Sequence, residues 1–220
     1  MRSFLKYFRS ALVLTVFMLV LCGFAYPAAL TGLGQLMFPH QANGSLITAE
    51  GEKTDDPEKA VGSAIVGQDF SGNPRYFQCR VSGVDYNTYT EEEKEEGSYT
   101  GVGSGGSNLA PSNEELKKRA EKSVEEFLEK NPDVEKGDIP ADLLTASGSG
   151  LDPHVSPASA AIQIPALAEA SGLSEETLEQ IVADHTTGKL LGIFGEETVN
   201  VLGVNLDIAL EMGLISETGR

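Results

Sequence analysis

The strongest constraint on this chain is an uncharged, mostly apolar stretch near its N-terminus. Between Arg9 and Glu50 the sequence contains no Lys, Arg, Asp or Glu. A helix rises about 1.5 Å per residue, so about 20 apolar residues cross the hydrocarbon core of a bilayer. We therefore predict a transmembrane helix over residues 10–33. A basic tip over residues 1–9 precedes it, and a soluble domain over residues 34–220 follows.

A cleaved signal peptide is the alternative interpretation of this stretch. Residues 11–21 would form its apolar region, and cleavage would follow Ala25. Apolar residues continue as far as Phe38, however, which favours a membrane span. Pro27 lies inside the stretch and has no N–H, so we expect a local disturbance of the helix there.

Charge predicts the orientation of the span. Arg2, Lys6 and Arg9 precede it, and no further Lys or Arg occurs before Lys53. Basic flanks stay on the cytoplasmic side, so we expect the tip inside and the domain outside. The chain has 16 Lys and Arg against 33 Asp and Glu; without the three basic residues of the tip, 13 remain and the charge is −20. This acidity argues against nucleic acid as a partner.

Local patterns predict a mixed α+β fold for the domain outside. Short runs rich in β-branched and aromatic residues indicate strands at 60–66, 75–81 and 198–202. Polar stretches rich in turn-forming residues indicate loops at 49–60, 85–107 and 145–157. Strands and helices do not alternate regularly, which is typical of the α+β class.

Capping signals predict where the helices begin. Ser112 and Glu115 form a capping box ahead of a helix that ends at residues 131–132. Ser156 followed by Pro157 begins a second helix, which runs toward residue 170. Ser174 begins a third, and residues 204–212 form the last one.

No complete catalytic or metal-binding motif emerges. A literal GxGxxG occurs at Gly101, Gly103 and Gly106, but an acidic run precedes it where a dinucleotide site needs a strand. Asp152 and His154 invite a triad with a nearby serine, although residues so close on one loop rarely align productively. The histidines are scattered, and the acidic run at 91–96 lacks the pattern of a calcium loop.

Small and polar residues instead gather in four blocks. Glycine allows close approach of backbones, and amide side chains satisfy buried backbone groups, so these blocks suit either internal turns or docking against another protein. The candidate residues are Gln41, Asn43, Gly44, Ser45, Gly62, Ser63, Gln68, Gly105, Gly106, Ser107, Asn108, Ser147, Gly148, Ser149, Gly150, Asp152 and His154.

These blocks resemble the KdpC family, the C subunit of the Kdp-type potassium-transporting ATPase. The most specific match is TASGSGLDPH at residues 145–154, and the resemblance covers roughly residues 10–212. Cys79 and Val81 stand where the family usually has glycine and proline. Further matching positions are 38–39, 41–46, 62–63, 67–68, 104–109, 156–157, 191–192, 195–196 and 199–202, with Phe70, Tyr76, Phe77, Arg80, Ser82, Gln163 and Asn205.

The resemblance implies a non-catalytic accessory subunit of a high-affinity potassium uptake complex in the cell membrane. Its partners would be a channel-like A subunit, a P-type ATPase B subunit and a small F subunit. ATP and potassium would be used by the complex. ATP binding is also implied for the family, but the expected topology places the blocks outside and the chain has no GxxxxGK[ST] phosphate loop, so we expect no cofactor of its own. The rival hypotheses are a membrane-anchored envelope hydrolase using Asp152 and His154, and a secreted binding module.

Overall fold

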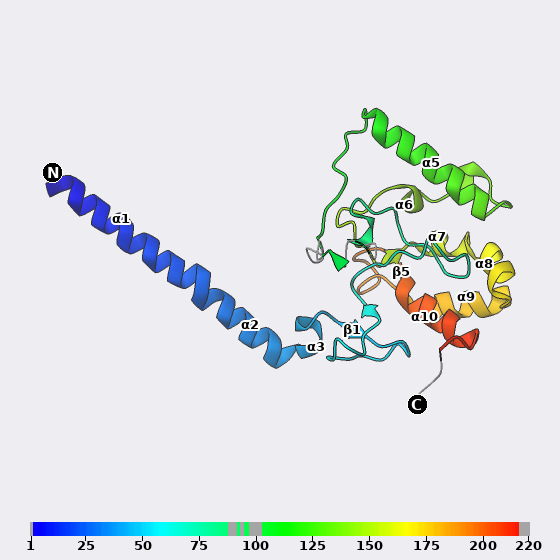
Figure 1. The fold of residues 1–220 in the computed structure, drawn as a ribbon, viewed down its shortest axis with the longest axis horizontal. Coiled ribbons are helices and arrows are strands. Elements are labelled where there is room, and N and C mark those ends of the chain that lie inside the picture. Colours follow the sequence, from blue (N-terminus) through cyan, green and yellow to red (C-terminus); the bar gives the residue numbers. More distant parts are fainter. Residues whose placement is uncertain (1, 88–91, 93–94, 97–102, 216–220) are drawn as a thin grey trace.

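One helical rod leads from the N-terminus to the rest of the chain (Figure 1). The computed structural model describes residues 2–87, 92, 95–96 and 103–215. The rod consists of α1 (Arg2–Val20), a π-helical turn (Leu21–Ala25) and α2 (Tyr26–Met37). Its apolar part is Phe4–Met37, whose most apolar window has a mean hydropathy of 2.2 and is not buried against the described part of the domain. By length and composition it is the one helix among the described residues that could cross a membrane.

The rod changes its hydrogen-bond register next to Pro27. The N–H of Tyr26 donates to the carbonyl of Leu21, five residues earlier, which closes a π-helical turn. Pro27 then occupies the first turn of α2, where a missing N–H costs little. The expected disturbance at Pro27 is therefore absorbed by the π-helical turn.

A small two-stranded sheet follows the rod. The short helix α3 (Pro39–Ala42) leads into β1 (Leu46–Ile47), which pairs antiparallel with β2 (Gly62–Ser63). The predicted strand at 60–66 is thus present, but only two of its residues pair. The stretch at 49–60 is a loop as predicted, apart from an isolated bridge between Ile47 and Lys53.

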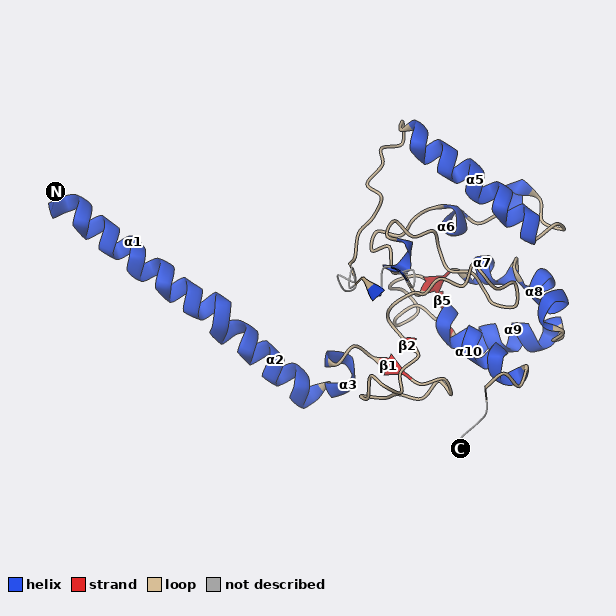
Figure 2. Ribbon diagram, in the orientation of Figure 1, coloured by secondary structure: helices blue, strands red, loops and turns tan. Residues whose placement is uncertain are grey.

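A second sheet lies in the domain between α5 on one side and α9 and α10 on the other (Figure 2). Its antiparallel strand order is β3-β5-β4, with Val199 opposite both Val155 and Thr186. The strands are β3 (His154–Val155), β4 (Thr186–Thr187) and β5 (Thr198–Asn200). The helices around it are α5 (Glu114–Lys130), α6 (Ala141–Leu144), α7 (Pro157–Ala161), α8 (Ile164–Ser171), α9 (Glu175–Asp184) and α10 (Val201–Glu211), and single 3-10 turns occur at Asp85–Asn87 and Lys136–Asp138.

The core forms where these helices meet the second sheet. Many of its members are apolar residues on the inward faces of α9 and α10 and on β5, which is why these elements pack together. The largest fully buried apolar side chains are Phe77, Val199, Val201, Val204, Leu178 and Ile208. This arrangement of short strands and helices beside one apolar rod confirms the predicted α+β class with a single N-terminal span.

The helix starts follow the capping signals in two of three cases. Ser156 and Ser174 are N-caps, accepting hydrogen bonds from the N–H groups of Ser159 and Thr177. The capping box at Ser112 was wrong, because Asn113 caps α5 instead and accepts from Glu115. The expected second helix is split into α7 and α8, and a proline stands in the first turn of α8. The expected strand at 198–202 ends at Asn200, which caps α10.

The predicted strand at 75–81 was wrong, because side chains take the place of a neighbouring strand. The N–H of Phe77 donates to Asn205 Oδ1 over 2.8 Å, and Asn205 Nδ2 donates back to the Phe77 carbonyl over 3.0 Å. The N–H of Gln78 donates to Gln163 Oε1 over 2.9 Å. Asn205 and Gln163 are both buried. These backbone groups of the segment are therefore satisfied without joining a sheet.

Candidate functional site

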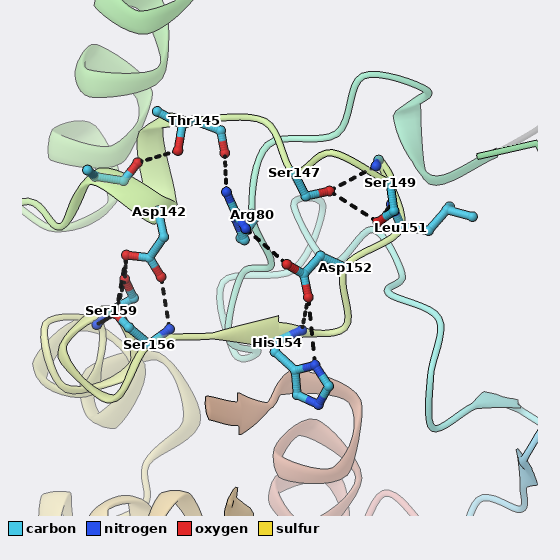
Figure 3. A network of polar contacts seen from close by, with 12 residues as sticks. Arg80, Asp142, Thr145, Ser147, Ser149, Leu151, Asp152, His154, Ser156 and Ser159 are labelled. Atoms are coloured by element: carbon cyan, nitrogen blue, oxygen red, sulfur yellow. Dashed lines mark hydrogen bonds and ion pairs between the residues drawn. The ribbon is translucent and has the colours of Figure 1, made fainter. Parts of the chain in front are cut away.

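The predicted block at residues 147–154 is a closed loop held by its own serines (Figure 3). Ser147 Oγ accepts from the N–H of Gly150 over 2.9 Å, and Ser149 Oγ accepts from the N–H of Leu151 over 3.1 Å. The two hydroxyl oxygens are 3.4 Å apart. Both serines therefore act as turn formers, the role that such side chains commonly take in tight loops.

Asp152 joins this loop to the segment that begins at Arg80. Arg80 Nη1 donates to Asp152 Oδ2 over 3.0 Å, and the N–H of His154 donates to Asp152 Oδ1 over the same distance. Hydrogen bonding from the His154 side chain, followed by that from the His154 backbone and Arg80, lowers the pKa of Asp152 despite its partial burial. The carboxylate thus stays ionised and fixes the end of the loop.

The serines and His154 do not form a nucleophile–base pair in this geometry. His154 Nδ1 lies 3.7 Å from Asp152 Oδ1, and its ring points away from Ser147 and Ser149 in Figure 3. Among the described residues no serine hydroxyl is hydrogen-bonded to His154. A hydrolytic triad needs that contact, so the arrangement supports the turn interpretation of this cluster.

Two other predicted blocks close around the same loop. The N–H of Gly67 donates to the carbonyl of Leu151 over 2.9 Å, and the N–H of Gly105 donates to that of Ser149 over 2.8 Å. The hydroxyl of Ser82 donates to the carbonyl of Gly150 over 2.6 Å. We call these residues, 67–68, 80–86, 104–108 and 147–154, the loop cluster. The structure therefore brings together residues that are more than eighty positions apart in the chain, such as Gly67 and Leu151.

The remaining blocks form a separate cluster where the rod meets the domain, which we call the exit joint (residues 35–45 and 61–66). The chain reverses here through Gly44 and Ser45, both with positive φ. Ser63 Oγ donates to the Gly44 carbonyl over 2.6 Å, and Gln35 Nε2 donates to Asn43 Oδ1 over 2.9 Å. The first bond joins β2 to this turn, and the second joins α2 to the residue before it.

Gln68 links the exit joint to the loop cluster. Its Nε2 donates to the carbonyl of Val61 over 3.0 Å, while the neighbouring Gly67 is hydrogen-bonded to Leu151 of the loop cluster.

The other candidate residues contribute backbone contacts rather than side-chain contacts. The Gln41 carbonyl accepts from Gly44, and Asn108 has a positive φ of 49°. The backbone nitrogen of Ser107 lies close to Gly83, and Gly106 lies beside the carbonyl of Gly148. A Cβ added to Gly148 would have no atom within 4 Å.

Asp142 secures the strand and helix that follow the loop cluster. Its carboxylate accepts from the N–H of Ser156 over 2.8 Å and from the hydroxyl of Ser159 over 2.7 Å. Burial alone would raise the pKa of Asp142, but these hydrogen bonds outweigh burial and lower it. The charged side chain therefore fastens α6 to the start of α7.

The described residues contain no cluster of three potential metal-ligating side chains. Two cavities of about 560 and 590 Å³ flank Gln78. The first has mainly apolar walls from α8 and the end of α5, and the second contains Gln68, Arg80 and Arg119. Desolvation raises the pKa of Cys79, in the second cavity, to about 12, so this thiol is not a reactive nucleophile at neutral pH.

The GxGxxG motif falls partly outside the described residues, as does the acidic run at 91–96.

Two features entered the sequence analysis only as family matches and were given no role there. One is the pair of buried amides, Asn205 and Gln163. The other is a hairpin at residues 189–196, of which only positions 191–192 and 195–196 were matches; we call it the apolar hairpin. It exposes Leu190 by 70%, Leu191 by 81%, Ile193 by 76% and Phe194 by 62%. Its signal in the sequence is an apolar run broken by glycines, with neither helical nor alternating spacing.

Comparison with known proteins gives one consistent result. A family model described as "KdpC: K+-transporting ATPase, c chain" matches residues 8–210. A potassium-transporting ATPase KdpC subunit from Clostridium kluyveri is 53% identical over 217 residues, covering 99% of this chain and 100% of the relative. The Clostridioides difficile KdpC subunit is 50% identical, covering 96% of this chain and 100% of the relative. A Bacillus cereus KdpC subunit is 43% identical, covering 89% and 91%.

Proposed function

The chain belongs to the KdpC family, and from that membership we propose that it is a non-catalytic accessory subunit of a potassium-transporting ATPase complex. The observation that carries this proposal is that the similarity spans both the apolar rod and the domain, from residue 8 to residue 210. In the proposed role, the rod anchors the chain in the cell membrane. The domain stabilises the assembly of the channel-like A subunit, the P-type ATPase B subunit and the small F subunit.

The rod supports this role because its most apolar window is not covered by any of the described residues. Its most apolar window is unburied, so its side chains are available to lipid and to other membrane helices. Small residues lie where α1 gives way to α2, namely Gly23, Ala25, Ala28 and Ala29. Small residues let helix backbones approach closely in a bilayer. The span is therefore suited to packing against larger membrane subunits.

The polar clusters support a structural role for the domain. The loop cluster and the exit joint hold backbone groups together, and their serines serve turns rather than a histidine base. In the proposed complex, ATP is used by the ATPase subunit and potassium passes through the channel-like subunit. This chain then contributes a surface that binds the other subunits and helps to hold the assembly together.

Co-purification tests the proposed role directly. The full chain carries an affinity tag and is expressed with its complex, and the membranes are solubilised in mild detergent. We expect a large ATPase subunit and a channel-like subunit, identified by mass spectrometry, in a constant ratio to the chain. A tagged, unrelated single-span protein from the same membranes serves as the control. Recovery of the chain as a lone monomer would refute the proposal.

We also propose that the N-terminal tip is cytoplasmic and the domain lies outside. The basis is the three basic residues ahead of the span and the absence of others before Lys53. Protease added to wall-stripped intact cells should degrade the domain and leave an N-terminal tag protected on a fragment the size of the tip and rod. Permeabilised cells, in which the tag is also accessible, provide the control. A domain that resists protease until the cells are permeabilised contradicts this topology.

A further inference from the structure

The apolar hairpin has a defined backbone. Leu190 and Phe194 form an isolated antiparallel bridge, with the N–H of Leu190 donating to the Phe194 carbonyl over 2.8 Å and the N–H of Phe194 donating back over 3.0 Å. At the base, Lys189 Nζ lies 3.3 Å from Glu196 Oε2. The hairpin continues from β4 and returns into β5, whose centre, Val199, is buried. The tip of the hairpin is therefore attached at both ends to strands of the second sheet, which is anchored in the core.

Exposed apolar side chains of the domain are concentrated at this tip. In the described part of the chain beyond residue 38, the large apolar side chains that are exposed are Val61, Ile65, Leu190, Leu191, Ile193, Phe194 and Leu214. Four of these seven fall within five consecutive residues. Single exposed apolar residues are ordinary on protein surfaces, whereas a contiguous patch marks an interaction site.

Leu191 adds a second, independent observation. Its φ is 55°, in the left-handed region that glycine and asparagine adopt more readily than leucine. The same side chain is 81% exposed, so it gains almost nothing from packing within its own chain. Both the backbone conformation and the exposure of this position would favour asparagine or glycine if folding alone decided the residue. A leucine kept in a strained conformation and exposed to water indicates a function outside the fold.

We propose that the apolar hairpin is the anchor of the domain on a membrane-embedded protein partner, seated in an apolar groove on that partner's outer surface. This inference rests on the proposed role as a subunit. The groove would receive Leu191, Ile193 and Phe194, while the ion pair at the base stays at the rim. Buried anchors surrounded by a polar rim are the usual anatomy of a protein interface.

The small size of the patch indicates that the partner must already be held close to this chain. Four side chains expose a patch on the order of a few hundred Å², whereas a stable interface between free proteins buries about 800 Å² on each side. The hairpin therefore needs a partner that is already held close by. The span supplies this proximity, because tethering two sites together raises the effective concentration of the second contact. A protein in the same membrane meets that condition.

Charge favours a protein groove over the lipid surface. The part of the chain after the tip carries a formal charge of −20, and anionic headgroups would repel it. The one basic residue of the hairpin, Lys189, is paired with Glu196. The hairpin thus offers no cationic rim for lipid headgroups, and an apolar groove in a protein matches its chemistry better.

Substitutions at the tip test the inference in the full chain and complex. Leu191→Asn and the double change Ile193→Ser with Phe194→Ser should each reduce the recovery of partner subunits in mild detergent at least tenfold. Leu191→Asn should at the same time leave the urea midpoint of the isolated chain unchanged or raise it, because it relieves strain. Ile65→Ser, at an exposed apolar residue elsewhere on the domain, is the matched control and should recover the partner normally.

Photocrosslinking identifies the occupant. With Phe194 replaced by p-benzoylphenylalanine, irradiation of intact membranes should join the chain to a larger membrane subunit, identified by its mass. Crosslinking to lipid or to a second copy of this chain would overturn the inference. Normal recovery of partners by both hairpin variants would also overturn it while leaving the subunit role intact. If the unmodified chain recovers no partner, it is the subunit role that fails.

Discussion

Replacing Gly150 by alanine is expected to lower the free energy of unfolding of the domain by about 3 kcal/mol. Gly150 has a φ of +68°, which any other residue adopts at a cost. An added Cβ would also lie 2.5 Å from the Gly105 carbonyl oxygen and 2.8 Å from Val84 Cγ2. Backbone strain and a collision with backbone atoms therefore act together at the centre of the loop cluster.

Pulse proteolysis of the full chain in detergent micelles, across a urea series, measures this change through its midpoint. Gly148→Ala is the matched control, because Gly148 lies two residues away in the same loop. Its φ is not in the left-handed range, and a Cβ added there would meet no atom within 4 Å. We expect that change to stay within about 0.5 kcal/mol. Equal midpoints for the two variants would show that the loop cluster is not tightly packed.

Asn205→Ala is expected to have an effect of similar or greater size, about 4 kcal/mol. The Asn205 amide makes two hydrogen bonds to the backbone of Phe77, and the two residues are 2% and 1% exposed. Removing the amide leaves a buried N–H and a buried carbonyl unsatisfied, each costing about 1–3 kcal/mol. The segment at 75–81 would lose the partner that replaces a neighbouring strand.

The same urea series measures this change, and Asn113→Ala is its control. Asn113 also accepts from a backbone N–H, that of Glu115, but at an exposed helix end where water can replace it. The loss of such a cap costs about 1 kcal/mol. If Asn205→Ala destabilised the domain no more than Asn113→Ala, the Phe77 backbone would have to be satisfied in another way, and our account of that segment would be wrong.

Features set by neighbouring residues could be predicted from the sequence. The span followed from an unbroken apolar run, and the starts of α7 and α9 followed from Ser156 and Ser174, because a capping side chain bonds within its own turn. The start of α5 was misplaced by one residue, since Ser112 and Asn113 are both good caps. Only tertiary contacts decide between two such neighbours.

Features set by distant residues could not be predicted in this way. Residues 75–81 have the composition of a strand, but their hydrogen-bond partners, Gln163 and Asn205, lie 85 and 128 residues away from the backbone groups they bind. The loop cluster has the same origin, because Gly67, Gly105 and Ser149 meet only in three dimensions. Its blocks were singled out by their small and polar residues, but which of these residues meet came only from the structure. The apolar hairpin was missed because an apolar run is normally read as core.

The π-helical turn at Leu21–Ala25 has a consequence for the two leaflets of the membrane. Each residue of an α-helix advances the side chains by about 100° around the axis, and a π-helical turn takes up one residue more than an α-helical turn. The side chains of α2 are therefore rotated relative to the positions that a continuation of α1 would give them. A stripe that faces one neighbour along α1 does not continue along α2. The two halves of the rod thus present different directions of contact, one at each depth of the bilayer.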